Sequence, residues 1–174
     1  MNRNVKKIVL SGLIAAMYVV PTLLQNTLFP GTASAAVQFR ASEALCVLAV
    51  FTPAAIPGLT VGCIISNIFA GLGAIDLVVG PLASFLAALG MYLLRNQRAL
   101  KLPILSLLCP AVSNGLLVGA EIALFFSEGQ AFWAVFWMNA GLVAVGELAA
   151  LFTLGVFLFL AVEKNSKLKE YIAG

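Results

Sequence analysis

Three kinds of residue on which soluble enzymes rely are scarce or missing in this sequence. Histidine is absent, charged residues make up 10% of the 174 residues, and the three cysteines are far apart. A soluble domain carries about a quarter charged residues, so this chain has too little charge to coat a globule in water. Metal sites and thiol chemistry need clustered ligands, and Cys46, Cys63 and Cys109 are predicted to serve as small apolar residues.

Further absences bound the function. The sequence has no nucleotide-binding loop of the Gly-x-x-x-x-Gly-Lys type and no serine–base pattern. Its net charge of +3 is not gathered in one basic patch, so nucleic acid is not an expected partner. We therefore predict no catalytic residues, no metal site and no cofactor, and any ATP-driven step must belong to partner chains.

Long apolar runs are what the sequence has in abundance, since 62% of its residues are hydrophobic. Backbone polar groups in hydrocarbon must be hydrogen-bonded within a helix or a closed barrel, and barrel strands would alternate apolar and polar residues. The runs are unbroken, which predicts helices. We predict an all-α integral membrane protein, a six-helix bundle forming one domain over 1–174, with spans at about 8–24, 37–51, 54–70, 77–94, 103–126 and 132–162.

The predicted spans differ in length. The second and third are short against the ~20 residues that a bilayer needs, and the last is overlong and must tilt, kink or emerge from the membrane. Five spans with a re-entrant segment are therefore an alternative. The amino end also resembles a cleavable signal peptide, with a possible site at Ala33-Ser34-Ala35. This triplet lies well beyond the apolar run, after Pro30 and Gly31, so we expect no cleavage there.

The basic residues predict the orientation. With six spans, both termini and the two even-numbered connections share one side of the membrane. Basic residues near the ends of helices stay in the cytoplasm. We predict a multi-pass protein of the cell membrane with both termini cytoplasmic, because that side holds nine of the ten basic residues, namely Arg3, Lys6, Lys7, Arg95, Arg98, Lys101, Lys164, Lys167 and Lys169. Arg40 is the basic residue left for the outer side.

Two carboxylates interrupt the apolar spans. Glu121 follows Asn114 by two helical turns, and Glu147 shares a helix face with Asn139. A central charge costs about 2.5 to 3.5 kcal/mol on insertion scales, and such residues usually face a cavity or a partner. Amides and carboxylates together suit a small flat solute rich in N–H groups, or a cation. The alternative is that these groups pair across helices to fix packing, although the last four spans contain no basic residue.

A second polar group is predicted at the outer entry to the second span. It comprises Gln38, Arg40, Ser42 and Glu43. Arg40 and Glu43 are three residues apart and could form a local ion pair, or the group could form one wall of an outward-facing site. Asp76 follows a glycine turn, which favours a helix cap.

Aromatic and small residues each allow two interpretations. Trp137 belongs to a group of aromatic residues that bracket the last outer loop, which is typical of an interfacial belt, although such a ring could also stack on a ligand. The first span carries two small pairs at a spacing of four, Ser11 with Ala15 and Gly12 with Ala16. Such pairs let another helix approach closely, either within this chain or on a separate membrane subunit.

Taken together, these stretches resemble the substrate-binding (S) subunits of energy-coupling-factor (ECF) vitamin transporters, and most of all their queuosine-precursor subfamily, QueT. The likeness covers nearly the whole chain. The family's usual alanine-x-x-x-alanine pattern in the first helix has serine or glycine at its first position here. The resemblance is carried by four stretches, Ser11–Ala16, Gln38–Leu45, Asn114–Glu121 and Trp137–Ala140 continuing to Gly146-Glu147.

The resemblance implies a subunit that captures its solute from outside and delivers it when a coupling membrane protein and two ATPase subunits engage it. Ser11, Gly12, Ala15 and Ala16 would contact the coupling protein. The solute would be a 7-deazaguanine such as 7-aminomethyl-7-deazaguanine, or the related base queuine. Alternatives are an S subunit for another cationic or nitrogen-rich solute, a proton-coupled secondary carrier, and an assembly subunit that binds no solute.

The same ligand implies roles for the polar residues. One carboxylate would accept the parallel N–H groups of the guanine-like edge, and another would bind the aminomethyl cation. We expect Glu147 in one of these roles and Glu43 or Glu121 in the other. The remaining polar contacts would come from Asn114, Asn139 and Gln38, with Arg40 and Trp137 also in the site and the loop 25–36 as a lid.

Overall fold

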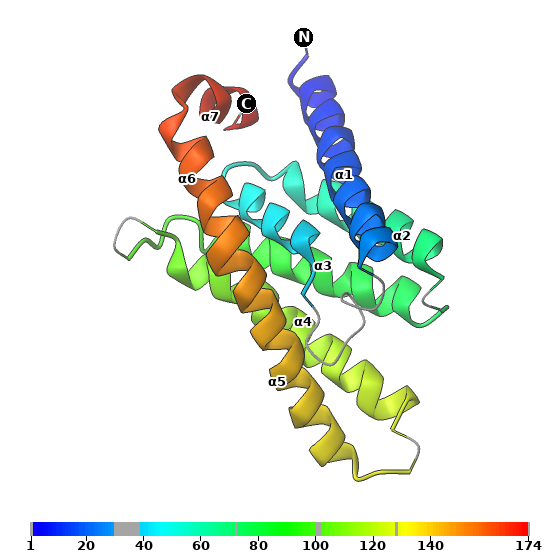
Figure 1. Cartoon of the computed structure of the whole chain (residues 1–174). Coiled ribbons are helices and arrows are strands. Elements are labelled where there is room, and N and C mark those ends of the chain that lie inside the picture. The colour runs from blue at the N-terminus through cyan, green and yellow to red at the C-terminus, as the bar shows by residue number, and fades with distance from the viewer. Residues whose placement is uncertain (1, 30–38, 72, 100–101, 128, 174) are drawn as a thin grey trace.

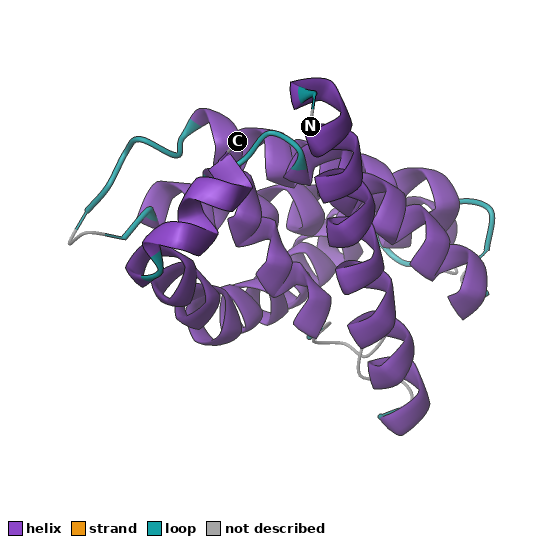
Figure 2. Ribbon diagram, turned by 90° about the horizontal axis from the view of Figure 1, so that it is seen from above, coloured by secondary structure: helices purple, strands orange, loops and turns teal. Residues whose placement is uncertain are grey.

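The computed structural model describes residues 2–29, 39–71, 73–99, 102–127 and 129–173. These residues form helices, with one isolated bridge between Ala99 and Leu102, so the all-α prediction is confirmed. Figure 1 shows the helices gathered around a central segment, with a long hairpin projecting from it, and Figure 2 shows from above that helices joined by loops make up the described chain. The elements are α1 (Arg3–Leu28), η1 (Ala41–Val50), α2 (Ala55–Ala70), α3 (Asp76–Leu93), α4 (Ile104–Phe125), α5 (Phe132–Ala150), η2 (Leu151–Gly155), α6 (Val156–Lys164) and α7 (Ser166–Ala173).

Four helical segments of the described chain are long and apolar enough to cross a membrane. They are Asn4–Leu28, Asp76–Leu93, Ile104–Phe125 and Phe132–Lys164. The two spans predicted at 37–51 and 54–70 form the shorter apolar helices η1 and α2. The overlong last segment runs from α5 into α6 through a π-helical turn. The short, polar α7 was not predicted, because it contains no apolar run that a reading based on hydrophobicity would detect.

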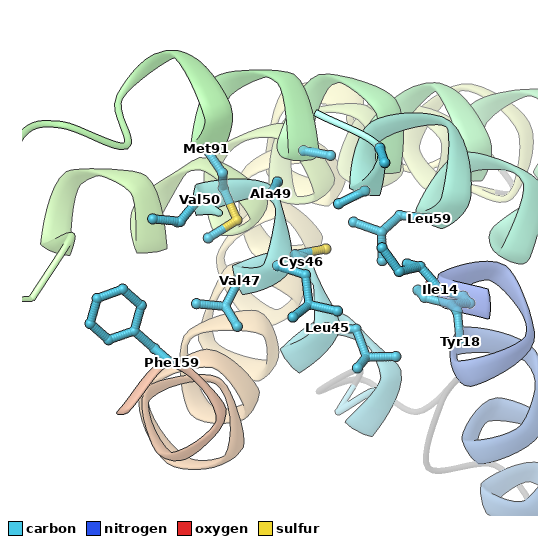
Figure 3. Packing of buried hydrophobic residues seen from close by; sticks show 14 of the residues in the cluster. Ile14, Tyr18, Leu45, Cys46, Val47, Ala49, Val50, Leu59, Met91 and Phe159 are labelled. Atoms are coloured by element: carbon cyan, nitrogen blue, oxygen red, sulfur yellow. The ribbon is translucent and has the colours of Figure 1, made fainter. Parts of the chain in front are cut away.

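The central segment is η1, a 3₁₀-helix of ten residues whose positions from Ser42 to Val50 are all buried. It contacts α1 to α5, η2 and α6. Figure 3 shows Cys46 and Val47 of η1 between Ile14 on one side and Phe159 on the other. A 3₁₀-helix rises about 2.0 Å per residue against 1.5 Å for an α-helix, so ten residues reach about 20 Å. Its apolar sequence therefore fills the core and is not exposed to lipid.

Glycines bring α2 against α1. A Cβ atom added at Gly58 would lie 2.7 Å from the Ser11 carbonyl oxygen, and one at Gly62 would lie 2.8 Å from the Tyr18 Cβ. The Ser11 hydroxyl also donates a hydrogen bond of 2.8 Å to the Ala54 carbonyl. Small residues four apart allow such close approach of two helices. The inner face of α1 is therefore occupied within this chain.

The hairpin of α4 and α5 is built in the same way. Added Cβ atoms at Gly115 and Gly119 would each lie 2.9 Å from the backbone of Ala140. Any larger side chain at either glycine would force the two helices apart, because a backbone cannot yield as a flexible side chain does. This contact places the inward-facing side chains of α4 within reach of those of α5.

Both termini lie at one end of the bundle (Figure 1). The Lys6 ammonium of α1 lies 5.1 Å from the centre of the Tyr171 ring of α7. Glu163 forms ion pairs with Arg98 at 3.0 Å and with Lys169 at 2.9 Å. The start of α1, the connection between α3 and α4, and the carboxyl-terminal helix are thus neighbours.

Candidate functional site

The amide of Asn114 and the carboxylate of Glu147 meet between α4 and α5. Asn114 Nδ2 donates a hydrogen bond of 2.5 Å to Glu147 Oε1. Both side chains are buried, and Glu147 Oε2 has no hydrogen-bond partner among the described residues. The predicted pairing across helices is therefore present, but it satisfies half of the carboxylate. A buried polar atom without a partner calls for a ligand, water or other explanation.

Glu121 lies on the same side of α4, two turns from Asn114 and 3% exposed. Neither of its carboxylate oxygens has a hydrogen bond within 3.5 Å to a described residue. It interacts electrostatically with Arg40 and with Asp76 at the start of α3, and it can share a hydrogen bond with Asp76 when one of the two carboxyl groups is protonated. The predicted cap at Asp76 is wrong, because Ile75 occupies the N-cap position of α3 and no side chain caps it. The Asp76 side chain instead faces Glu121.

Arg40 supplies the positive charge that the last four spans lack. It precedes η1 in an extended conformation, and its buried Nε has no hydrogen-bond partner among the described residues. It interacts electrostatically with the four carboxyl groups of Glu43, Asp76, Glu121 and Glu147. Of the two interpretations of Arg40 and Glu43, a local ion pair within 4.0 Å is not present, because the ion pairs at that distance among described residues are those of Glu163.

Glu43 belongs to a closed hydrogen-bond network between α1 and η1. It is 1% exposed and accepts hydrogen bonds from the Tyr18 hydroxyl and, at 3.2 Å, from the Cys46 thiol. One turn along α1, the Thr22 hydroxyl donates to the Ser42 hydroxyl at 2.8 Å. Tyr18 was not predicted as a site residue. A tyrosine four residues before Thr22 in an apolar run is the one feature of the sequence that indicates a polar face on this helix.

The balance of charge in this group is acidic. Four carboxyl groups face one guanidinium, which gives a formal charge of −3 if all are ionised. Buried charges need partners, and a surplus of carboxylates is best matched by a cation or by N–H donors. Among the described residues, no three carboxylate or thiol groups are arranged to hold a metal ion. The arrangement suits an organic solute that donates several hydrogen bonds.

Two other predicted site residues lie apart from this group, and a third is outside the described residues. Asn139 is half-buried, and its amide donates to the Val135 carbonyl at 2.8 Å within α5. Trp137 is 62% exposed and lines an apolar groove on the outer surface of α4 and α5. Gln38 and most of the predicted lid lie outside the described residues, as does the Ala33-Ser34-Ala35 triplet.

The predicted docking residues of α1 divide into two pairs. Ser11 and Ala15 face α2, where Gly58 and Gly62 pack against them. Gly12 and Ala16 are exposed, and nothing lies within 4 Å of a Cβ added at Gly12. Internal packing therefore uses one pair and leaves the other on the surface.

Helices that can cross a bilayer and that enclose ionisable groups without hydrogen-bond partners among the described residues are typical of membrane transport proteins. The chain belongs to the QueT transporter family, whose model matches residues 8–164. The match includes every residue of the polar group just described and confirms the resemblance found in the sequence. No curated protein and no solved structure matches the chain.

Proposed function

We propose that this chain is the substrate-capture subunit of an ATP-driven ECF importer for a queuosine precursor, a 7-deazaguanine such as 7-aminomethyl-7-deazaguanine or queuine. The proposal rests on the Glu147 carboxylate, which accepts a hydrogen bond from Asn114 on one oxygen and has no partner among the described residues on the other. This carboxylate belongs to a group in which carboxyl groups outnumber basic side chains. Family membership supports a transported solute of this class. An anionic vitamin would meet repulsion there, whereas a solute rich in N–H groups would satisfy the unpaired oxygens.

The guanine-like edge of such a solute matches Glu147. This edge presents a ring N–H and an exocyclic amine side by side, and one carboxylate accepts both in a two-point, charge-assisted contact. Glu147 Oε2 is unpaired and Oε1 has a second lone pair. Asn114 keeps the carboxylate in place and has a second N–H for the ring carbonyl. The flat faces of the ring would lie against apolar side chains.

The membrane arrangement belongs to the same proposal. We take η1 and α2 with the four longer segments as six crossings, with both termini in the cytoplasm because nine of ten basic residues fall on that side. Arg40 and Asp76 then lie toward the outside, where solute enters. The exposed pair Gly12 and Ala16 is the surface that we assign to the coupling membrane protein, which works with two ATPase subunits.

Titration of the purified protein in detergent tests the ligand. We expect tight binding of 7-aminomethyl-7-deazaguanine and little or no binding of riboflavin or thiamine. Glu147→Gln replaces one acceptor by a donor and should weaken binding by about 100-fold, since losing a charge-assisted hydrogen bond and leaving a donor unpaired costs about 3 kcal/mol. If folded protein binds no deazapurine, the assignment of the solute is wrong.

Uptake into vesicles tests the partners. Accumulation of the deazaguanine should require the coupling protein, both ATPases and ATP, whereas uptake by this chain alone down a proton gradient would identify a secondary carrier. Gly12→Leu should abolish ATP-driven uptake and leave binding unchanged, because its side chain would extend from the surface. Gly141→Leu is the matched control, since Gly141 is also exposed with nothing within 4 Å. Equal uptake by both variants would exclude docking through Gly12.

A further inference from the structure

Asp76 and Glu121 form a second, separate feature of the site. We propose that these two carboxylates are an ammonium subsite that selects 7-deazaguanines with a cationic arm over neutral ones. The inference rests on the proposed function. In it, Asn114 and Glu147 bind the base, whereas Asp76 and Glu121 bind the amine. Asp76 was not among the residues that the sequence predicted for the ligand.

The first observation is the state of Glu121. A carboxylate that is 3% exposed and has two oxygens without hydrogen bonds among the described residues is costly to bury. Its electrostatic neighbours are Asp76 and Arg40: Asp76 repels it when both carboxyl groups are ionised and shares a hydrogen bond with it when one is protonated, and Arg40 is shared with three other carboxyl groups. A primary ammonium placed between the two carboxylates would supply three donors and cancel the repulsion. The subsite is therefore matched to a cation.

The backbone of Asp76 is held in place by a contact with α2. It begins α3, and its backbone carbonyl accepts a hydrogen bond of 2.8 Å from the Asn67 amide of α2. Asn67 in turn packs against Gly80, where an added Cβ would lie 2.6 Å from its Nδ2. These contacts use the backbone of Asp76 and leave its carboxylate to interact with Glu121 and with a ligand. The half-buried side chain lies on the side from which solute would enter.

The separation of the two subsites suits a substituted deazaguanine. Glu121 and Asn114 are seven residues apart on α4, which corresponds to about 10 Å along the helix axis. A fused bicyclic ring with a one-carbon arm, and a hydrogen bond at each end, spans a distance of this order. The base would lie deep between α4 and α5 with its arm directed outward. Arg40 interacts electrostatically with an acid of each subsite, Glu121 and Glu147.

Glu43 is the other acid that the sequence offered for the amine, and its contacts argue against that role. Its two oxygens already accept hydrogen bonds from Tyr18 and Cys46. Each oxygen retains a second lone pair, but Glu43 is 1% exposed and already has a donor on both oxygens, so it gains less from an ammonium than Glu121 does. Glu43 is a positioning residue, which fixes η1 and therefore Arg40.

The test compares two ligands that share the base and differ in the arm, 7-aminomethyl-7-deazaguanine and the neutral 7-cyano-7-deazaguanine. Calorimetric titration of the wild-type chain should show a preference for the cation of about 10- to 100-fold, the value of one hydrogen bond between charged groups. In Glu121→Gln and in Asp76→Asn the preference should fall to a few-fold or less, with affinity for the nitrile kept. In Glu147→Gln both ligands should weaken together.

Each outcome decides a different point. If neither compound binds the wild-type chain, the proposed function fails. If both bind equally well to it, or if Glu121→Gln and Asp76→Asn weaken both compounds to the same extent, the function stands and the ammonium subsite is overturned. Asp76→Asn affects a half-buried position, so it reports on the subsite even if Glu121→Gln perturbs folding. A thermal unfolding curve for each variant verifies that the protein compared is folded.

Discussion

Two buried polar groups meet at the centre of this protein, and they differ in how completely they are hydrogen-bonded. The group between α1 and η1 is closed, since its members bond one another: Tyr18, Thr22, Ser42 and Glu43. The group carried by α3, α4 and α5 comprises Asp76, Asn114, Glu121 and Glu147. It contains the hydrogen bond from Asn114 to Glu147, while both oxygens of Glu121 and one of Glu147 accept no hydrogen bond from a donor among the described residues. Both are surrounded by the same apolar bundle.

The difference in hydrogen bonding indicates which group stabilises the fold and which one binds the solute. A closed network recovers the free energy lost on removing polar groups from solvent, whereas each unsatisfied buried group costs about 1 to 3 kcal/mol. A protein keeps such groups where a ligand satisfies them. We therefore assign the closed group to folding and the open group to the solute. Substitutions in the two groups should have opposite consequences for stability and for binding.

The largest effect on stability and binding should come from a substitution that separates α4 from α5, the two helices that hold Asn114, Glu121 and Glu147. Gly119→Leu would place a side chain where a Cβ alone lies 2.9 Å from the Cα and N atoms of Ala140. We expect α4 and α5 to separate, with a loss of stability above the 1 to 3 kcal/mol typical of overpacking and with loss of deazaguanine binding. Thermal unfolding in detergent and titration measure the two effects.

The control for this prediction is Gly141→Leu, at an exposed glycine of α5 with open space around it. It should change the unfolding temperature little and leave binding intact. A Gly119→Leu protein as stable as this control would show that the contact between the two helices does not hold the open group together.

The next effect contrasts the two groups directly. Tyr18→Phe removes the hydroxyl that donates to Glu43 and leaves a buried oxygen of that carboxylate unpaired. We expect a loss of about 1 to 3 kcal/mol in the free energy of unfolding, with the ranking of ligands unchanged. Glu147→Gln should do the reverse, because glutamine retains the hydrogen bond from Asn114 and removes an unpaired charge. If Tyr18→Phe changed ligand ranking without loss of stability, the division between the groups would be wrong.

The sequence predicted which polar residues share a helix face, but it did not predict which residues of other helices they meet. Helical spacing placed Asn114 and Glu121 on one side of α4, and both side chains are buried. Periodicity tells which residues share a face but not which helix that face meets. The convergence of Arg40 and Asp76 on Glu121 depends on contacts between distant elements, and no spacing within a segment encodes it.

The same distinction between local features and contacts of distant elements applies to the fold. Apolar runs revealed the four long helical segments, since hydrophobicity and length are local properties. The run at 37–51 has the composition of a span, yet η1 is buried on every side because other helices surround it. On α1 the two small pairs look equivalent in sequence. Their separation into an inner pair and an outer pair follows from Gly58 and Gly62 of a different helix.

The smallest effect should come from Trp137, which the sequence offered as a ligand contact. It lies on α5 together with Glu147, but its ring is 62% exposed on the outer groove, whereas Glu147 is 4% exposed. Trp137→Leu keeps an apolar side chain on that surface, and exposed substitutions change free energies by about 0.5 kcal/mol or less, or about twofold in affinity. Titration with 7-aminomethyl-7-deazaguanine measures this change. A loss of tenfold or more would mean that the solute contacts the outer groove of α4 and α5, and the open group at Glu147 would then need another explanation.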